Sequence, residues 1–107
     1  MPSPSGDLTE RVVIQNVSVI QGGLLVTAKA KAGEDVTIAI AWIKYTNGTI
    51  ATRGDMPSTV LPMDGTLKDI TVILPPGSLS SGTNYMVTLV SLEGESFVSP
   101  TFTFVTT

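Results

Sequence analysis

The chain has 107 residues, of which 42% are hydrophobic and only 14% are charged, and its formal net charge is −3. This length fits one domain with one core, and so few charges exclude a disordered chain. Cysteine and histidine are both absent, which excludes disulfides, thiolate or imidazole metal ligands and the usual catalytic triads. The six basic residues are scattered, whereas nucleic-acid binding needs a concentrated basic surface. We therefore expect a protein that is not an enzyme and that binds no cofactor, metal or nucleic acid.

The start of the chain is rich in proline, serine and glycine, which predicts a linker over 1–9 ahead of a single domain over 10–107. A membrane-spanning run of about 18 apolar residues is absent from the sequence. The first residues also lack the basic start and apolar stretch of a secretory signal. We expect the chain to belong to a longer protein, with any anchor or signal lying upstream.

Abundant Val, Ile and Thr in alternating apolar and polar positions predict strands along the whole chain. The expected strands cover 11–20, 24–30, 36–45, a short stretch from 49, 67–74, 83–92 and 97–105. Asn47-Gly48 predicts a type I′ hairpin, which needs positive φ at both residues. Segment 52–65 contains several Gly and Pro residues and predicts a loop in which any strand is short or at an edge. Pro100 predicts that the last strand is an edge or carries a bulge.

Seven short strands with turn signals roughly every 8–12 residues are typical of an all-β, immunoglobulin-like two-sheet sandwich. The absence of a cysteine pair favours a fibronectin III-like or other non-antibody variant. Trp42 lies on the third strand, where such sandwiches bury a tryptophan, so we expect it in the core. Tyr85 lies near the start of the sixth strand, and we expect its hydroxyl to hydrogen-bond the backbone of the preceding loop, over 79–82.

The third strand is apolar on both of its faces. We predict that the face with Ile40 and Trp42 points inward and that Ala39, Ala41 and Ile43 point outward. A two-sheet sandwich has one inward face per sheet, so Ala39, Ala41 and Ile43 are a candidate protein interface. The alternative is a central strand whose small outward residues are covered by neighbouring side chains.

Arg53-Gly54-Asp55 lies in the predicted loop. In some extracellular matrix proteins this triplet is bound by integrins when an exposed loop presents it, so Arg53, Gly54 and Asp55 are a candidate recognition loop. The alternative is a turn in which glycine permits the backbone conformation and both charges face water.

Asn16-Val17-Ser18 and Asn47-Gly48-Thr49 match the acceptor pattern for N-glycosylation. Asn47 is the better candidate because a hairpin tip is exposed. The alternatives are a chance match in a chain rich in Ser and Thr, and an asparagine selected for its turn conformation. The acidic residues do not follow the spacing of a calcium loop, so we expect them to be solvated charges. These acidic residues include Glu34, Asp35, Asp64, Asp69, Glu93 and Glu95.

The segments 74–77 (Leu-Pro-Pro-Gly), 81–85 (Ser-Gly-Thr-Asn-Tyr) and 102–104 (Phe-Thr-Phe) resemble the end of a fibronectin type III module. With the strand 36–40 (Val-Thr-Ile-Ala-Ile) and the hairpin 45–49 (Tyr-Thr-Asn-Gly-Thr), they also resemble the extracellular β-sandwich of archaeal pilin-like proteins. That group includes archaeal flagellins and the accessory proteins that anchor the archaeal flagellar motor to the envelope. The resemblance covers residues 10–106 and is one of composition and pattern. The hydrophobic helix that precedes the sandwich in that group is absent from this chain.

This resemblance implies a structural or binding module outside the cell membrane, extracellular or pseudoperiplasmic, in an archaeal surface filament or archaellum anchor. The partners it implies are an envelope (S-layer) protein, a filament protein or a second copy of the chain. Contact with the membrane would come only through an anchor that this chain lacks. The alternative is a generic fibronectin III-like adhesion or spacer domain of a secreted protein.

Overall fold

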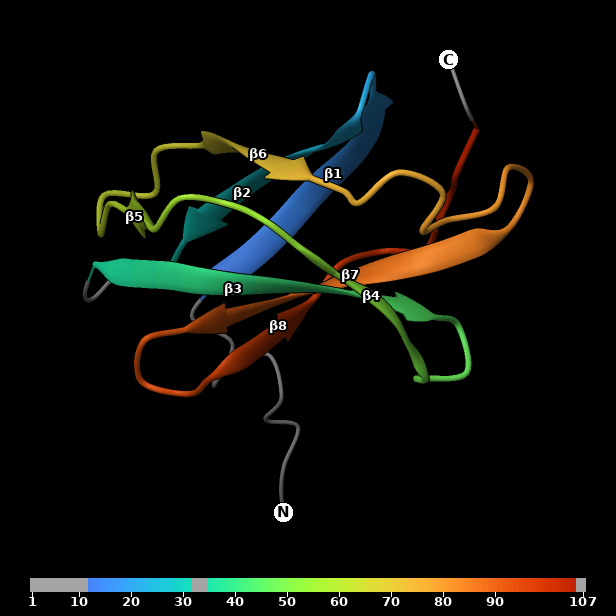
Figure 1. Ribbon diagram of the computed structural model, residues 1–107. Coiled ribbons are helices and arrows are strands. Elements are labelled where there is room, and N and C mark those ends of the chain that lie inside the picture. Colours follow the sequence, from blue (N-terminus) through green and yellow to red (C-terminus); the bar gives the residue numbers. More distant parts are fainter. Residues whose placement is uncertain (1–11, 32–34, 106–107) are drawn as a thin grey trace.

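The computed structural model describes residues 12–31 and 35–105, which form two β-sheets packed face to face and contain no helix (Figure 1). Sheet A has the strand order β1-β2-β6, formed by Val12–Ile20, Gly23–Ala30 and Lys68–Ile73. Sheet B has the order β4-β3-β7-β8, formed by Ile50–Gly54, Val36–Tyr45, Asn84–Ser91 and Ser96–Val98. Two short strands complete sheet B: β5 (Thr59–Leu61) pairs with β3, and β9 (Phe102–Thr103) pairs with β7.

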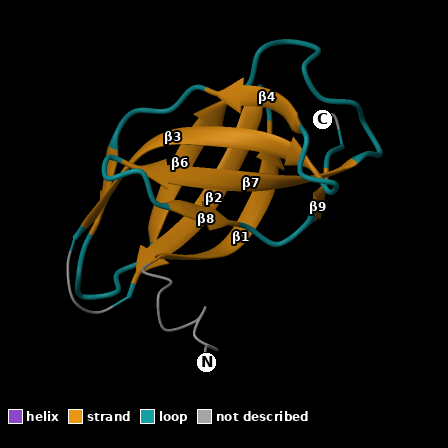
Figure 2. Ribbon diagram, turned by 90° about the horizontal axis from the view of Figure 1, so that it is seen from below, coloured by secondary structure: helices purple, strands orange, loops and turns teal. Residues whose placement is uncertain are grey.

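The chain passes between the two sheets after β2, after β5 and after β6, and every strand pair is antiparallel. Seen from below, the strands of sheet B lie across those of sheet A at an angle (Figure 2). Antiparallel strands in two facing sheets, with crossovers between the sheets, are the architecture of immunoglobulin-like domains. The predicted all-β sandwich is confirmed.

The core lies between the sheets and is built by alternation along the strands. In β2, Leu24, Val26, Ala28 and Ala30 are fully buried, whereas the residues between them are only partly buried. The buried residues of β6 alternate in the same way. Those of β7 do so too, except that Thr88 on its outward face is also buried. A strand with one buried face positions its other face toward solvent, so each sheet also has an outer face.

A β-bulge at Ala39 interrupts this alternation in β3. Ile38 pairs with β7 and so does Ile40, but Ala39 between them has no partner on β7. An extra residue reverses which face the following side chains occupy. Ile38 therefore faces the core before the bulge, and Ala41 and Ile43 face it afterwards, both with an exposed fraction of 0%.

The bulge makes four of the predictions for this strand wrong. Ala41 and Ile43, predicted to point outward, are in the core. Ile40 and Trp42, predicted to point inward, are only partly buried on the outer face of sheet B. Ala39 is partly buried at the bulge itself. The candidate interface of Ala39, Ala41 and Ile43 is therefore not an outward surface. An uninterrupted alternation over 36–45 leaves out the extra residue at the bulge, so it assigns the residues after the bulge to the wrong face.

Tyr85, at the start of β7, forms the expected tyrosine corner. Its side chain is 1% exposed, and its hydroxyl accepts a hydrogen bond of 2.8 Å from the backbone N–H of Ser80. The ring packs against three aromatic rings, those of Tyr45, Phe102 and Phe104, with centroids 5.3, 6.2 and 6.4 Å away. This prediction is confirmed, and the contacts secure the β6–β7 loop to the end of the core.

The hairpin between β3 and β4 differs from the predicted type I′ turn. Gly48 has a φ of 92°, and among the described residues positive φ occurs only at glycines, so Asn47 does not have it. The Gly48 N–H donates to the Tyr45 carbonyl at 2.9 Å, and the Tyr45 N–H donates to the Thr49 carbonyl at 2.8 Å. This pattern is a three-residue loop in which glycine alone adopts the left-handed conformation.

Pro100 divides the last predicted strand into β8 and β9, as expected for a proline within a strand. Ser99 continues the pairing with β7 after β8 ends. Its N–H donates to the carbonyl of Val87 at 2.8 Å, and its Oγ accepts the Val87 N–H at 2.8 Å.

Candidate functional site

The two sheets present different outer faces. Along the middle of sheet A, Asn16, Thr27 and Asp69 lie side by side on β1, β2 and β6. The Thr27 hydroxyl donates to the Asp69 carboxylate at 2.9 Å, and the Asn16 amide donates to the Ser18 hydroxyl at 3.1 Å. These hydrogen-bonded polar side chains make the middle of this face polar. Further along the same face lie Leu25, which is partly buried, and Ile73, which is 51% exposed.

The outer face of sheet B is apolar across its centre. Trp42 on β3 lies opposite Thr88 on β7, and Thr88 lies opposite Val98 on β8. In the next row, Ile40 lies opposite Val90. We call this surface the outer patch; it comprises Ile40, Trp42, Met86, Thr88, Val90 and Val98.

Exposure within the outer patch is graded. Val98 is 53% exposed, and Ile40, Trp42, Met86 and Val90 are partly buried. Thr88, at the centre, is only 3% exposed, and its hydroxyl is buried with no hydrogen-bond partner. Neighbouring side chains therefore already cover a polar group on a face that would normally be wet, which leaves a continuous apolar surface.

Basic side chains lie at one end of this face. Arg53 on β4 is paired with Trp42, and its guanidinium carbon is 5.7 Å from the centre of the Trp42 ring. This is the distance of a cation–π contact. Lys44, two residues beyond Trp42 on β3, is paired with Met86 of the outer patch.

Acidic side chains lie at the other end. Asp35 precedes β3 and Glu93 follows β7, and both line a depression of about 170 Å³ together with Thr37 and Leu92. The Asp35 carboxylate accepts the N–H of Met63 at 2.8 Å, which fixes its position beside the start of the strand.

The Arg53-Gly54-Asp55 triplet is not in an exposed loop, so that prediction is wrong. Arg53 and Gly54 belong to β4, and Gly54 is buried. A Cβ at Gly54 would collide with Cγ1 of Val72 on the opposite sheet. The Asp55 backbone exchanges two hydrogen bonds of 2.8 Å with Ile73, which joins the edge of sheet B to sheet A. The glycine is therefore required for the close approach of the sheets.

The two glycosylation candidates are both exposed. Asn47 is in the β3–β4 hairpin, where its side-chain oxygen accepts the N–H of Thr49 at 2.9 Å. Asn16 lies on the outer face of sheet A, and its hydrogen bond joins it to Ser18 of the same acceptor pattern. Both side chains are accessible to an enzyme, and modification of either one stays a prediction.

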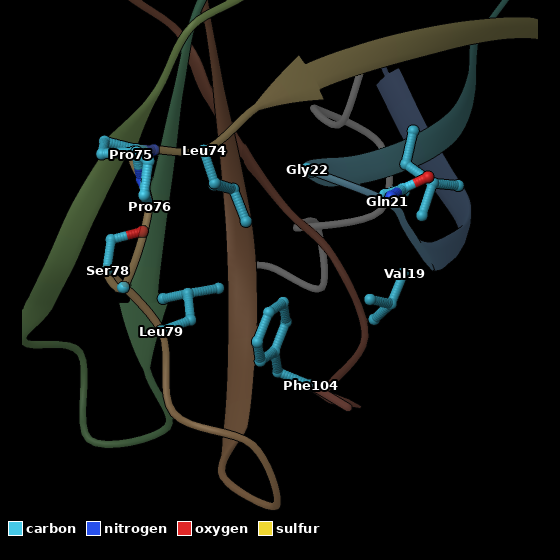
Figure 3. A pocket seen from close by; sticks show the side chains of 12 residues that line it. Val19, Gln21, Gly22, Leu74, Pro75, Pro76, Ser78, Leu79 and Phe104 are labelled. Carbon is cyan, nitrogen blue, oxygen red and sulfur yellow. The ribbon is translucent and has the colours of Figure 1, made fainter. Parts of the chain in front are cut away.

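A separate cavity of about 200 Å³ opens at one end of the sandwich, between the β1–β2 turn and the β6–β7 loop (Figure 3). Leu74, Leu79 and Phe104 form one side of it and Val19 lies across from them. The lining contains no ionisable side chain. Ser78 also lines it, but the Ser78 hydroxyl is buried and has no hydrogen-bond partner. This cavity is an apolar space without an acid–base pair.

No three acidic side chains gather as metal ligands in the part of the chain that the structure describes. The Asp64 carboxylate instead accepts the side-chain hydroxyl of Thr66 at 2.7 Å and the Thr66 N–H at 2.9 Å. These two hydrogen bonds hold the pKa of Asp64 below its ordinary value. Within 12–31 and 35–105 the structure contains no helix long and apolar enough to cross a membrane.

Comparison with models of known protein families and with curated proteins finds no match for this chain.

Proposed function

We propose that this chain is a non-enzymatic structural or binding module that acts through protein–protein contact, and that the outer patch of sheet B is its contact surface. The observation that carries the proposal is the difference between the two sheets. Sheet A has hydrogen-bonded polar side chains along its middle, whereas sheet B has an apolar surface centred on Trp42, Ile40 and Val98. Exposed apolar patches with a polar margin mark interaction sites.

The composition of the outer patch supports this proposal. Tryptophan, methionine and arginine are enriched in protein interfaces, and tryptophan and arginine carry much of their binding energy. Arg53 stacks over Trp42 at the margin of the patch, so the two residues present one shaped surface. Covering apolar area contributes about 25 cal/mol for each Å² removed from water.

The proposed setting is outside the cell membrane, in an archaeal surface filament or its envelope anchor, with an S-layer or filament protein as partner. The resemblance of the sequence to archaeal pilin-like sandwiches supports this setting. An all-β domain without cysteine, in which a sheet face makes the contact, is compatible with such a role.

The experiment is co-sedimentation of the purified chain with isolated archaeal S-layer sheets and with isolated surface filaments. Val98→Asp places a charge in the outer patch at a half-exposed position, so the fold is preserved while contact requires desolvation of a carboxylate. Thr71→Asp is the matched control, on the exposed outer face of sheet A.

We expect Val98→Asp to reduce binding at least about tenfold and Thr71→Asp to leave it unchanged, with both variants melting at the temperature of the wild-type chain. If the wild-type chain binds neither preparation, the proposed setting is wrong. Equal binding by both variants would place the contact on another surface.

A further inference from the structure

The outer face of sheet B carries opposite charges at its two ends. β3 begins beside Asp35, and Lys44 is the next-to-last residue at its other end. Arg53 on β4 is paired with Trp42, near that second end. β7 runs antiparallel to β3, so Glu93 after β7 returns to the side of Asp35. The N–H of Leu92 donates to the carbonyl of Thr37 at 3.1 Å, which holds the residues after β7 beside the start of β3.

We infer that this face pairs with the same face of a second copy of the chain, around a two-fold axis that runs across the strands. This inference rests on the proposed function and names the partner. Such an axis, passing near the row of Ile40 and Val90, turns the sheets of the two copies antiparallel. The basic end of each copy then lies over the acidic end of the other, and the apolar centres meet between them.

Symmetry makes each contact in this arrangement occur twice, because a two-fold interface uses the same surface on both copies. At both ends of the interface, the long side chains of Lys44 and Arg53 of one copy approach the carboxylates of Asp35 and Glu93 of the other copy. The depression of about 170 Å³ between Asp35 and Glu93 offers room for an ammonium or guanidinium group of the second copy. Reversing the relative direction of the sheets would instead place like charges together, so the charges also select the orientation.

The size of the face sets the expected strength of the pairing. The four strands contain 10, 5, 8 and 3 residues. At about 3.3 Å per residue and about 4.8 Å per strand, their face covers roughly 400 Å² on each copy, or about 800 Å² in total, which is below the usual size of a stable interface. The pair is therefore a weak, reversible dimer that forms where the chain is concentrated.

Sedimentation equilibrium of the purified chain at low ionic strength tests this pairing with two charge-reversed variants. The first carries Lys44→Glu and Arg53→Glu, so both ends of its face are acidic. The second carries Asp35→Asn and Glu93→Lys, so both ends are basic, and the asparagine keeps an acceptor for the N–H of Met63.

We expect the wild-type chain to dimerise reversibly and each variant alone to associate at least about tenfold more weakly. An equimolar mixture of the two variants should recover dimerisation, because acidic ends then face basic ends at both sites. Lys29→Glu with Lys68→Glu is the matched control for the first variant, because it makes the same change in net charge but on sheet A. This control should dimerise like the wild-type chain.

The pairing is overturned if the wild-type chain stays monomeric at millimolar concentration, or if folded charge-reversed variants fail to recover dimerisation when mixed. Circular dichroism establishes that each variant is folded, and Val98→Asp replaces any variant that is not. A monomeric chain whose binding to envelope preparations still falls with Val98→Asp refutes the self-pairing alone. A dimer that depends on the charges, without binding to those preparations, refutes the proposed setting alone.

Discussion

Substituting Ile43 and, in a separate variant, Ile40 with alanine compares two residues of one strand that the bulge at Ala39 places on opposite faces. Ile43 is 0% exposed in the core, and Ile40 is partly buried on the outer face. Each substitution removes three carbon atoms, whose transfer from water is worth about 0.8 kcal/mol each, so about 2.4 kcal/mol in full burial. At Ile43 the closed core also leaves a cavity, and the expected loss of unfolding free energy is about 3–4 kcal/mol.

At Ile40 the loss is smaller because part of the side chain is exposed and the space it leaves opens to solvent. We expect about 1–1.5 kcal/mol there. Urea unfolding followed by far-ultraviolet circular dichroism gives both values, provided that the m-values match. A loss at Ile40 equal to or larger than that at Ile43 would refute the bulge and restore the uninterrupted register.

Three further changes test other parts of the structure. Tyr85→Phe removes the hydroxyl that accepts a loop N–H, and thermal or urea unfolding should show a loss of about 1–1.5 kcal/mol; no loss would contradict the tyrosine corner. Gly54→Ala should destabilise the domain by about 1–3 kcal/mol because its Cβ meets Val72, and the same substitution should cost less in a chain that already carries Val72→Ala if the collision is its cause. Thr66→Val removes a hydrogen bond that lowers the pKa of Asp64, so a carboxyl NMR titration should move toward the ordinary pKa, and an unchanged titration would contradict that cause. Since the folded pKa is lowered, the stabilisation by this carboxylate is present above the ordinary pKa and is lost as the pH falls through the lowered value.

The architecture could be predicted from the sequence because strand alternation and turn residues are local signals. β2 and β3 occupy nearly the predicted residues, and the partner of Tyr85 lies within the predicted loop. Pro100 divides the last strand for a local reason as well, because proline cannot donate to the sheet.

The face of β3 could not be read from its apolar residues, since both faces are apolar and a bulge changes their order. One signal in the sequence does point to the outer patch. Lys44, the next-to-last residue of the strand, favours water, and in period-two alternation Trp42 and Ile40 share its face. Val36 at the other end belongs to the core. The inward position of Val36 and the outward position of Lys44 are compatible only if the strand contains one extra residue between them.

The position of Gly54 could not be predicted either, because its reason lies in the other sheet. The close approach of Val72 and the pairing of Asp55 with Ile73 depend on how two distant segments meet. The outer patch and its charged ends likewise arise from β3, β4, β7 and β8 together. Each of these strands alone shows only part of the surface.

The central claim is that the outer patch becomes covered when the protein makes its contact, and the single tryptophan of the chain reports on it directly. Incorporation of 5-fluorotryptophan places one ¹⁹F nucleus at residue 42, whose solvent exposure is measured by the shift between H₂O and D₂O. As the concentration of the chain is raised, we expect this solvent shift to decrease in step with the average mass from sedimentation. A mass that rises while the solvent shift stays constant would show that Trp42 remains open to water in the assembled state, and would contradict the account.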